Sequence, residues 1–286
     1  SPDLARSSSG DTVATEEQTP QDKQTILPVQ NTKAEDALLA SLDLIPRTEK
    51  DRLEQERDGI MAKVGLLADL HPEVFCRTYN FRFWEDEVAI YPLAALCALG
   101  APQKLIEFVF DLCPAAARDA VNVECRYAKN VDLLQFFCDK SPTVMSIPDP
   151  VEGELPLQIA CQGGKLDVVR FVYDAYPEAL THKDKYGWTP FHDALFLSDI
   201  PIIEYLMERS DNNAVLRQTN KNGFTPLHYA FRNKRKKVSE FVVKRFPDYL
   251  REAREDISSA PLHYVCRKGT TIAGIKVLLE NDPEAS

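Results

Sequence analysis

Basic residues are in deficit in this sequence. Its 286 residues include 34 lysines and arginines against 44 aspartates and glutamates, which gives a formal charge of -10 and a pI near 5.1. Proteins bind phosphate groups through a basic field. The acidic balance therefore argues against broad binding of nucleic acids or anionic membranes, and nucleic acid is not an expected partner.

Long uncharged runs are also lacking. The longest one extends from Val88 to Gln103 and contains two prolines. A membrane-spanning helix needs about 20 consecutive apolar residues, so we expect no membrane span. Hydrophobic residues still make up 44% of the chain, which suffices for a folded core.

Motifs of known catalytic chemistry are missing as well. The sequence contains no phosphate-binding loop, no dinucleotide fingerprint, no Gly-x-Ser-x-Gly elbow and no His-Glu-x-x-His zinc motif. Its seven cysteines are odd in number and include no Cys-x-x-Cys pair, which disfavours a disulfide framework or a zinc site. We expect a non-enzymatic protein without cofactor or metal, located in the cytoplasm, with the nucleus as the alternative reducing compartment.

What the sequence does contain is a repeat. The segment Thr189–Ala194 reads Thr-Pro-Phe-His-Asp-Ala, and Thr225–Ala230 reads Thr-Pro-Leu-His-Tyr-Ala. The repeated prolines stand at 156, 190, 226 and 261, at steps of 34, 36 and 35 residues. This period predicts a solenoid of short helical pairs. Thr at the N-cap and Pro in the first helical position suit the start of each inner helix.

A second proline signal follows the repeat prolines of every unit that has one except the fourth, where Ser210–Asn213 stands instead. Prolines at 114, 177, 247 and 283 lie 21 or 22 residues after prolines 92, 156, 226 and 261. A proline at this position ends the second helix of a pair. Three cysteines follow a repeat proline by five residues, which predicts small core positions: Cys97, Cys161 and Cys266.

The Thr-Pro-Leu-His-x-Ala pattern resembles the ankyrin repeat. The resemblance implies an all-α fold, an ankyrin-type α-solenoid of stacked helix-turn-helix repeats with connecting hairpin loops. We expect a disordered polar tail at 1–32 and an N-terminal helical segment at 33–89 that includes a divergent capping unit. An array of about six units would fill 90–286. The chain begins without Met and stops just after a helix ending, so we expect it to be part of a longer protein.

The second unit of this array, 121–153, is degenerate. Alignment with the third unit places Val121 where the repeat proline should stand and Cys125 at the small alanine position. Ser141 and Pro142 then fall at the end of the second helix.

Repeated histidines occupy one position of the motif. His192, His228 and His263 each follow a repeat proline by two residues. A solenoid stacks such positions and does not gather them at one centre. The resemblance implies that each histidine bonds the capping threonine and the neighbouring backbone, so we interpret all three as structural.

The resemblance also implies where a partner binds, because ankyrin repeats use their hairpin tips and the outward positions of the inner helix. Carried onto this sequence, the partner-binding positions are Lys185, Tyr186, Trp188, Phe196, Leu197, Lys221, Phe224 and Arg232. Exposed aromatics beside arginine are typical of interface hot spots. The alternative is that Trp188 and Phe224 pack between adjacent hairpins as part of the core.

A basic cluster interrupts the acidic sequence. It comprises Lys234, Arg235, Lys236 and Lys237, separated from Arg232 by Asn233 alone. Such a run is a candidate nuclear-localisation or anion-binding patch. The alternative is a solvated turn between the two helices of the fifth unit.

Together these patterns predict a non-catalytic protein–protein interaction scaffold. The partner would be another protein or a peptide segment, bound on the concave hairpin and inner-helix surface of a monomer. The alternative is a targeting or regulatory module of a larger enzyme or assembly whose catalytic domain lies outside this fragment.

Overall fold

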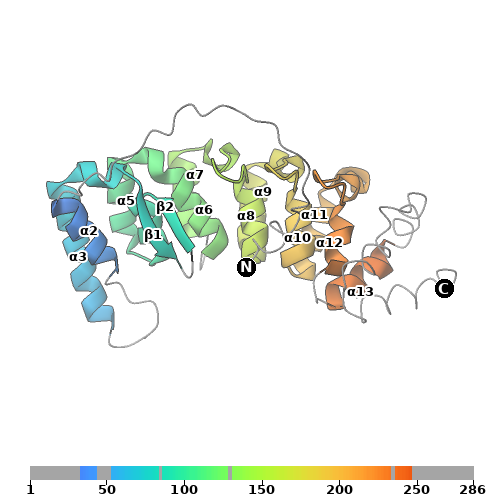
Figure 1. Cartoon of the computed structure of the whole chain (residues 1–286), viewed down its shortest axis with the longest axis horizontal. Coiled ribbons are helices and arrows are strands. Elements are labelled where there is room, and N and C mark those ends of the chain that lie inside the picture. Colours follow the sequence, from blue (N-terminus) through green and yellow to red (C-terminus); the bar gives the residue numbers. More distant parts are fainter. Residues whose placement is uncertain (1–32, 44–52, 84–85, 128–130, 233–235, 247–286) are drawn as a thin grey trace, which may run out of the picture.

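The computed structural model describes residues 33–43, 53–83, 86–127, 131–232 and 236–246. Its helices stack in chain order, from α2 and α3 at one end to α12 and α13 at the other (Figure 1). The all-α solenoid expected from the repeat is confirmed. Residues 1–32 and the sixth unit, with Pro261, His263 and Cys266, lie outside the described residues.

The first elements precede the repeats. Helix α2 (Lys33–Asp43) packs on α3 (Leu53–Leu70), and the 3-10 helix η1 (Pro72–Cys76) follows. Strands β1 (Tyr79–Phe83) and β2 (Asp86–Ile90) then form an antiparallel hairpin, so the end of the segment expected to be helical over 33–89 is a strand pair. Buried Glu35 of α2 accepts a bond of 2.6 Å from Nη1 of Arg77 and one of 3.4 Å from the Tyr79 hydroxyl, so α2 is tied to the hairpin.

Helical pairs make up the array. Their bounds are α4 (Pro92–Ala98) with α5 (Gln103–Leu112), α6 (Ala117–Tyr127) with α7 (Asp132–Lys140), α8 (Pro156–Gly163) with α9 (Leu166–Ala175), α10 (Pro190–Leu197) with α11 (Ile200–Glu208), and α12 (Pro226–Arg232) with α13 (Lys236–Arg245). The inner helices α4, α6, α8, α10 and α12 pack on one another in that order. All of them except α6 begin at a repeat proline, where the missing N–H needs no partner.

Short 3-10 helices follow the outer helices. They are η2 (Pro114–Ala116), η3 (Val144–Ser146), η4 (Pro177–Thr181) and η5 (Asp211–Arg217). The outer helices α5, α7 and α9 each end two residues or less before Pro114, Pro142 or Pro177, as the second proline signal predicts. Loops then lead to the next inner helix at 147–155, 182–189 and 218–225; we call these the finger loops.

The second unit has no finger loop. After η2 the chain enters α6 at Ala117 directly, so Val121 lies inside the helix and not at its start. The helix therefore begins four residues before Val121, the position aligned with the repeat proline. No proline or glycine stands between Ala116 and Val121, so the sequence there contains no helix breaker. Cys125 is buried as expected for a small core position.

The core runs continuously between the inner and outer helices. Cys97 and Cys161 are buried in it, as their position in the repeat predicts, and burial raises the pKa of both thiols. All the cysteines of the described residues are free thiols. None of the helices in this part of the chain is both long and apolar enough to cross a membrane.

Helix α8 packs closely against α6 at Gly163. A Cβ atom added there would lie 2.7 Å from the carbonyl oxygen of Cys125 and 2.8 Å from that of Arg126, and backbone cannot move aside cheaply. We expect Gly163→Ala to lower the free energy of unfolding by about 1–3 kcal/mol through overpacking, measured by urea denaturation.

Gly59 provides the matched control for this prediction. It is also helical, in α3, but a Cβ atom there would meet nothing within 4 Å. Gly59→Ala should raise the free energy of unfolding by about 0.5–1 kcal/mol, because alanine favours a helix over glycine. Stabilisation by both substitutions would show that the α6–α8 contact does not require glycine.

Candidate interaction surface

Each finger loop is shaped by one polar side chain at its start. Oδ1 of Asp184 accepts the backbone N–H groups of Tyr186 at 2.8 Å and Trp188 at 2.7 Å. Oδ1 of Asn220 accepts those of Asn222 and Phe224, both at 3.0 Å. Aspartate and asparagine favour such turns because their side chains replace a backbone acceptor. The tips at 185–187 and 221–223 are thereby held in defined positions.

Neighbouring finger loops bond to one another. The backbone N–H of Lys185 donates to the carbonyl of Glu152 at 2.9 Å, and that of Lys221 donates to the carbonyl of Tyr186 at 2.9 Å. Gly187 has φ of 80°, and a Cβ atom on it would lie 2.9 Å from the Lys221 nitrogen. Glycine is required there for both the left-handed backbone and the close approach. The tips of the third, fourth and fifth units thus form one continuous ladder.

Two of the three repeat histidines, His192 and His228, have the structural bonds that were predicted, and His263 lies outside the described residues. Nδ1 of His192 accepts the backbone N–H of Thr189 at 3.1 Å and lies 2.9 Å from the Thr189 hydroxyl. Because Nδ1 is an acceptor, the proton sits on Nε2, which donates to the carbonyl of Phe224 at 3.1 Å in the next finger loop. His228 repeats the bonds to its own threonine, Thr225, at 3.1 and 2.8 Å.

Trp188 does not belong to the exposed surface, which corrects the expectation that its ring faces a partner. Only 3% of the residue is exposed. Its ring centroid lies 4.3 Å from that of Tyr229 and 5.8 Å from that of Phe196, with which it forms a T-shaped contact. The fifth unit packs Tyr229 of α12 directly against it. For Trp188 the alternative interpretation is therefore correct: its side chain packs between adjacent hairpins as part of the core.

Among the remaining predicted positions, Phe196 contacts this tryptophan. Lys185 and Lys221 are exposed at the tips, and the ammonium of Lys185 lies 4.9 Å from the centroid of the Tyr186 ring. A hydrogen bond from Lys185 to Glu152 raises the lysine pKa. Tyr186, Phe196, Leu197 and Phe224 are half-buried. Phe196 and Phe224 both pack edge-on against Tyr229, so the structure brings them into one cluster.

The basic cluster is described only in part. Arg232 ends α12 and Lys236 begins α13, so the run does fall between the two helices of the fifth unit. Lys237 is exposed. Lys234 and Arg235 lie outside the described residues, as do the side chains of Arg232 and Lys236. Whether this cluster binds anything stays a prediction.

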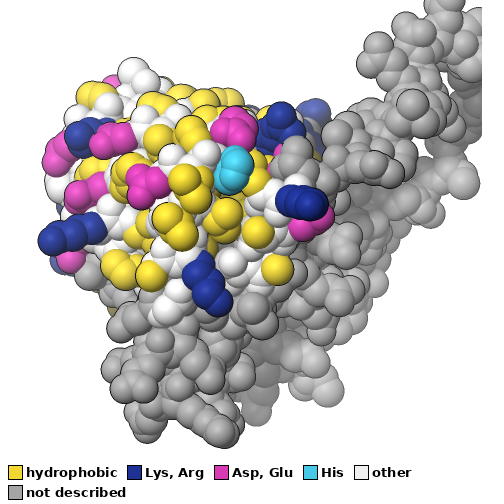
Figure 2. Space-filling model, turned by 90° about the vertical axis from the view of Figure 1, so that its left-hand side faces the viewer, with side chains coloured by type: hydrophobic (Ala, Val, Ile, Leu, Met, Phe, Trp, Pro, Cys, Tyr) yellow, Lys and Arg dark blue, Asp and Glu magenta, His cyan; other side chains and the backbone are white. Residues whose placement is uncertain are grey.

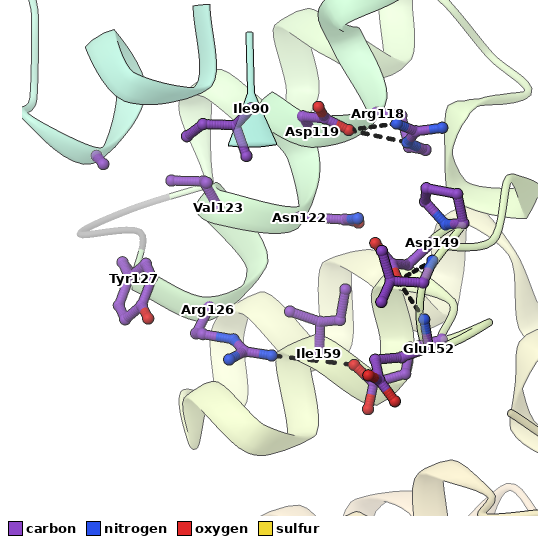
Figure 3. A pocket seen from close by; sticks show the side chains of 14 residues that line it. Ile90, Arg118, Asp119, Asn122, Val123, Arg126, Tyr127, Asp149, Glu152 and Ile159 are labelled. Carbon is purple, nitrogen blue, oxygen red and sulfur yellow. Dashed lines mark hydrogen bonds and ion pairs between the residues drawn. The ribbon is translucent and has the colours of Figure 1, made fainter. Parts of the chain in front are cut away.

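The structure adds a cavity that sequence reasoning missed. It has a volume of about 500 Å³ and lies between β2, α6 and the finger loop 147–155. Figure 3 shows Asn122 pointing from α6 into this space, with Asp149 and Glu152 across from it. The signal that could have found it is the lack of a proline and a turn before Val121, which removes a finger loop from the second unit.

A second feature is the surface of the first end of the array. Figure 2 shows hydrophobic side chains gathered across this end, with acidic and basic side chains around them. Leu66 and Leu70 of α3 are exposed there. An end unit of a solenoid normally presents a polar outer face. The outer face at this end is more apolar than that of a usual capping unit. In the described part of the chain no group of three or more histidine, cysteine or carboxylate side chains is arranged to hold a metal ion.

Comparison with known proteins agrees with this architecture. A family model described as "Ankyrin repeats (3 copies)" matches residues 121–215. This match confirms the resemblance to ankyrin repeats across the second, third and fourth units, including the degenerate one.

Curated relatives match over limited stretches. "SMC5-SMC6 complex localization factor protein 1" is 26% identical over 115 residues in Bos taurus and 25% identical over 115 residues in Homo sapiens. Each match covers 40% of this chain and 11% of the relative. "Ankyrin repeat-containing protein C6C3.08" of Schizosaccharomyces pombe is 31% identical over 99 residues, covering 34% of this chain and 42% of the relative. The matches therefore span less than half the length of any of these relatives.

Proposed function

We propose that this chain, whose residues 121–215 are ankyrin repeats, is a non-catalytic protein–protein interaction scaffold. The partner, a protein or a peptide segment, binds on the concave surface formed by the finger loops and the inner helices. The observation that carries the proposal is the ladder of bonded finger loops, Glu152 to Lys185 and Tyr186 to Lys221. A preorganised ladder loses little entropy when a partner binds.

The proposed contact surface is centred on the fourth and fifth units. It comprises Lys185, Tyr186, Phe196, Leu197, Lys221, Phe224 and Arg232. Half-buried aromatic side chains that are held in place by a core neighbour act as rigid anchors in interfaces. Trp188 is that neighbour for Phe196. The exposed lysines at the tips would then select the charge of the partner and speed its association.

A targeting or regulatory module within a larger protein is the second candidate. The match to a relative named as a complex localization factor favours it, because only 11% of that relative is covered. Under this second hypothesis, the repeats bind an assembly and thereby localise the larger protein of which they are part. The complete reading frame separates the two candidates, since a further domain signature beside the repeats would favour the module. The free buried thiols fit a reducing compartment, which we take to be the cytoplasm, with the nucleus as the alternative.

Site-specific photo-crosslinking in source-cell extract tests the interaction scaffold. The crosslinker p-benzoylphenylalanine is placed at position 186, at position 221, or at position 204 on exposed outer helix α11. We expect the same protein adducts at 186 and 221 and none of these at 204. Reversal of the tip charges by Lys185→Glu with Lys221→Glu should change the adduct yield at 186 roughly tenfold. Each attraction between a tip lysine and a charge of the partner would become a repulsion, and each repulsion an attraction.

The crosslinked variants must retain the wild-type circular dichroism spectrum to be compared. Adducts of equal yield at 204 and 186 would reject the concave surface, because the outer helices would then contact the partner equally. Adducts that appear only at 204 would move the binding surface to the outer helices.

A further inference from the structure

We propose that the cavity of the second unit is a docking site for a basic, partly apolar segment of a partner protein, which occupies the place of the missing finger loop. This inference rests on the proposed function, since it names a partner chemistry for one part of the same concave surface. Its site lies between the first and third units, and none of its lining residues belongs to the contact surface of the fourth and fifth units. The two surfaces are linked by the hydrogen bond from Lys185 to Glu152.

The gap exists because one finger loop is absent from an otherwise continuous row. The hairpin β1–β2 precedes α4, and finger loops precede α8, α10 and α12. Between them η2 leads directly into α6. The finger loops of the third and fourth units each receive a backbone bond from the next one: Glu152 from Lys185, and Tyr186 from Lys221. Within the described part of the chain, no finger loop lies on the other side of 147–155, where the backbone N–H of Val151 donates to its own Asp149 at 2.9 Å.

The walls of the gap offer apolar contact. Ile90 of β2, Val123 of α6 and Ile159 of α8 line it, and Val151 at the finger loop is 68% exposed. An exposed valine at the rim of an apolar cavity gains when a partner covers it. A volume of about 500 Å³ lies in the range of ligand pockets and accommodates a few side chains.

Buried hydrogen-bond acceptors also face this gap. Oδ1 of Asn122 and Oε2 of Glu152 are buried and accept no hydrogen bond from any described residue. A buried acceptor without a donor costs about 1–3 kcal/mol, so a bound group that supplies N–H donors recovers this cost. Asn122 points into the cavity from the side opposite Glu152 (Figure 3). A guanidinium or ammonium group carries several donors and no acceptor, and it fits this pair.

The charges of the cavity select the sign of the partner. Its lining includes the carboxylates of Asp119, Asp149, Glu152 and Glu154 but only two guanidinium groups. Both of these are already engaged by cavity carboxylates: Arg118 with Asp119 at 2.7 Å and Arg126 with Glu154 at 3.9 Å. Lys185 contacts Glu152 from outside the cavity. Asp149 accepts the backbone N–H groups of Val151 and Glu152. The excess of carboxylates therefore favours a cationic segment.

Binding of defined peptides to the full chain tests the proposal. The probe is a fluorescein-labelled ten-residue peptide that alternates valine with arginine, followed by fluorescence anisotropy. A peptide that alternates valine with glutamate tests the charge, and one that alternates serine with arginine tests the apolar contribution. We expect the valine–arginine peptide to bind at least about tenfold more tightly than either of the other two.

Val151→Arg is the decisive variant, with Leu70→Arg as its matched control. Both replace a strongly exposed apolar residue, so neither should affect folding, and both add the same charge to the chain. Val151→Arg should weaken the valine–arginine peptide by at least about tenfold, whereas Leu70→Arg should leave it within about twofold. Asn122→Leu removes the buried acceptor at similar volume and should also weaken binding.

Several results would overturn the proposal. Equal binding by the valine–glutamate peptide would remove the charge argument, and equal weakening by both arginine variants would show a general charge effect. A dimer of the chain that Val151→Arg dissociates would assign the cavity to a second copy. Crosslinking at 186 and 221 with no peptide binding at the cavity would refute this inference while the proposed function stands; peptide binding without those crosslinks would do the reverse.

Discussion

Trp188→Ala is expected to lower the free energy of unfolding by about 3–5 kcal/mol, the usual cost of removing a large buried aromatic side chain. The ring is almost fully buried between the fourth and fifth units and contacts Tyr229, Phe196 and His192. Its removal would leave a cavity at a unit boundary. A solenoid gains its stability from such boundaries, so the fifth unit should detach first.

Urea denaturation followed by far-ultraviolet circular dichroism measures this effect without relying on the fluorescence of the removed ring. Tyr186→Ala is the matched control, because it deletes a half-buried aromatic side chain two residues away at the finger tip. The control should cost about 1 kcal/mol or less. Equal costs for the two variants would show that Trp188 contributes no more to the core than the tip does.

This result also decides how the contact surface should be mapped. A binding defect in a Trp188 variant cannot be separated from the loss of the boundary between two units. Substitutions at Tyr186, Lys185 and Lys221 leave that boundary in place, since these residues lie on the tip side of the ladder. Partner contacts should therefore be assigned from the tips, with the core aromatic residues left unchanged.

The regular features of the fold could be predicted from the sequence because each has a local cause. Proline starts a helix where its missing N–H costs nothing, and this rule placed the starts of α4, α8, α10 and α12. The histidine bonds could be predicted because Thr189 and His192 lie three residues apart in the first turn of one helix. Local patterns of this kind do not depend on how the units pack.

The features that the sequence did not reveal depend on contacts between units. Tyr229 covers Trp188 only because α10 and α12 pack side by side, and their relative rotation is not encoded in either helix alone. The cavity results from the missing finger loop between η2 and α6. It forms because the β1–β2 hairpin on one side and the finger loop 147–155 on the other flank the empty position. An irregular repeat in the sequence therefore indicates where a site lies, but it does not identify the residues that line the site.

Glu124→Gln should stabilise the array much more at pH 8 than at pH 5. Glu124 lies in α6, in the unit without a finger loop, and only 6% of it is exposed. Burial raises the pKa of its carboxyl to about 7, against an ordinary value of 4.5, and the opposing attraction of Lys165 is smaller. The cost arises from a charge that the low-dielectric surroundings do not solvate.

The sign of the pH dependence follows from this shift. Below pH 4.5 the carboxyl is protonated in both the folded and the unfolded chain, so it costs nothing. As the pH rises to about 7 the unfolded chain ionises first, and the folded chain loses stability until both forms are charged. The full loss is about 3 kcal/mol at 1.36 kcal/mol per pKa unit.

Urea midpoints at pH 5 and pH 8 measure the effect as a difference between variant and wild type, which cancels the titration of every other group. The difference should be about 1 kcal/mol or less at pH 5 and reach about 3 kcal/mol in favour of glutamine at pH 8. Glu204→Gln, on the exposed face of α11, should show a difference below about 0.5 kcal/mol at both values. A pH-independent difference for Glu124→Gln would mean that the carboxyl is solvated in the folded chain. If the predicted dependence is found, the unit that lacks a finger loop is also one that ionisation loosens near neutral pH, and the walls of its cavity should open more readily than those of the bonded ladder.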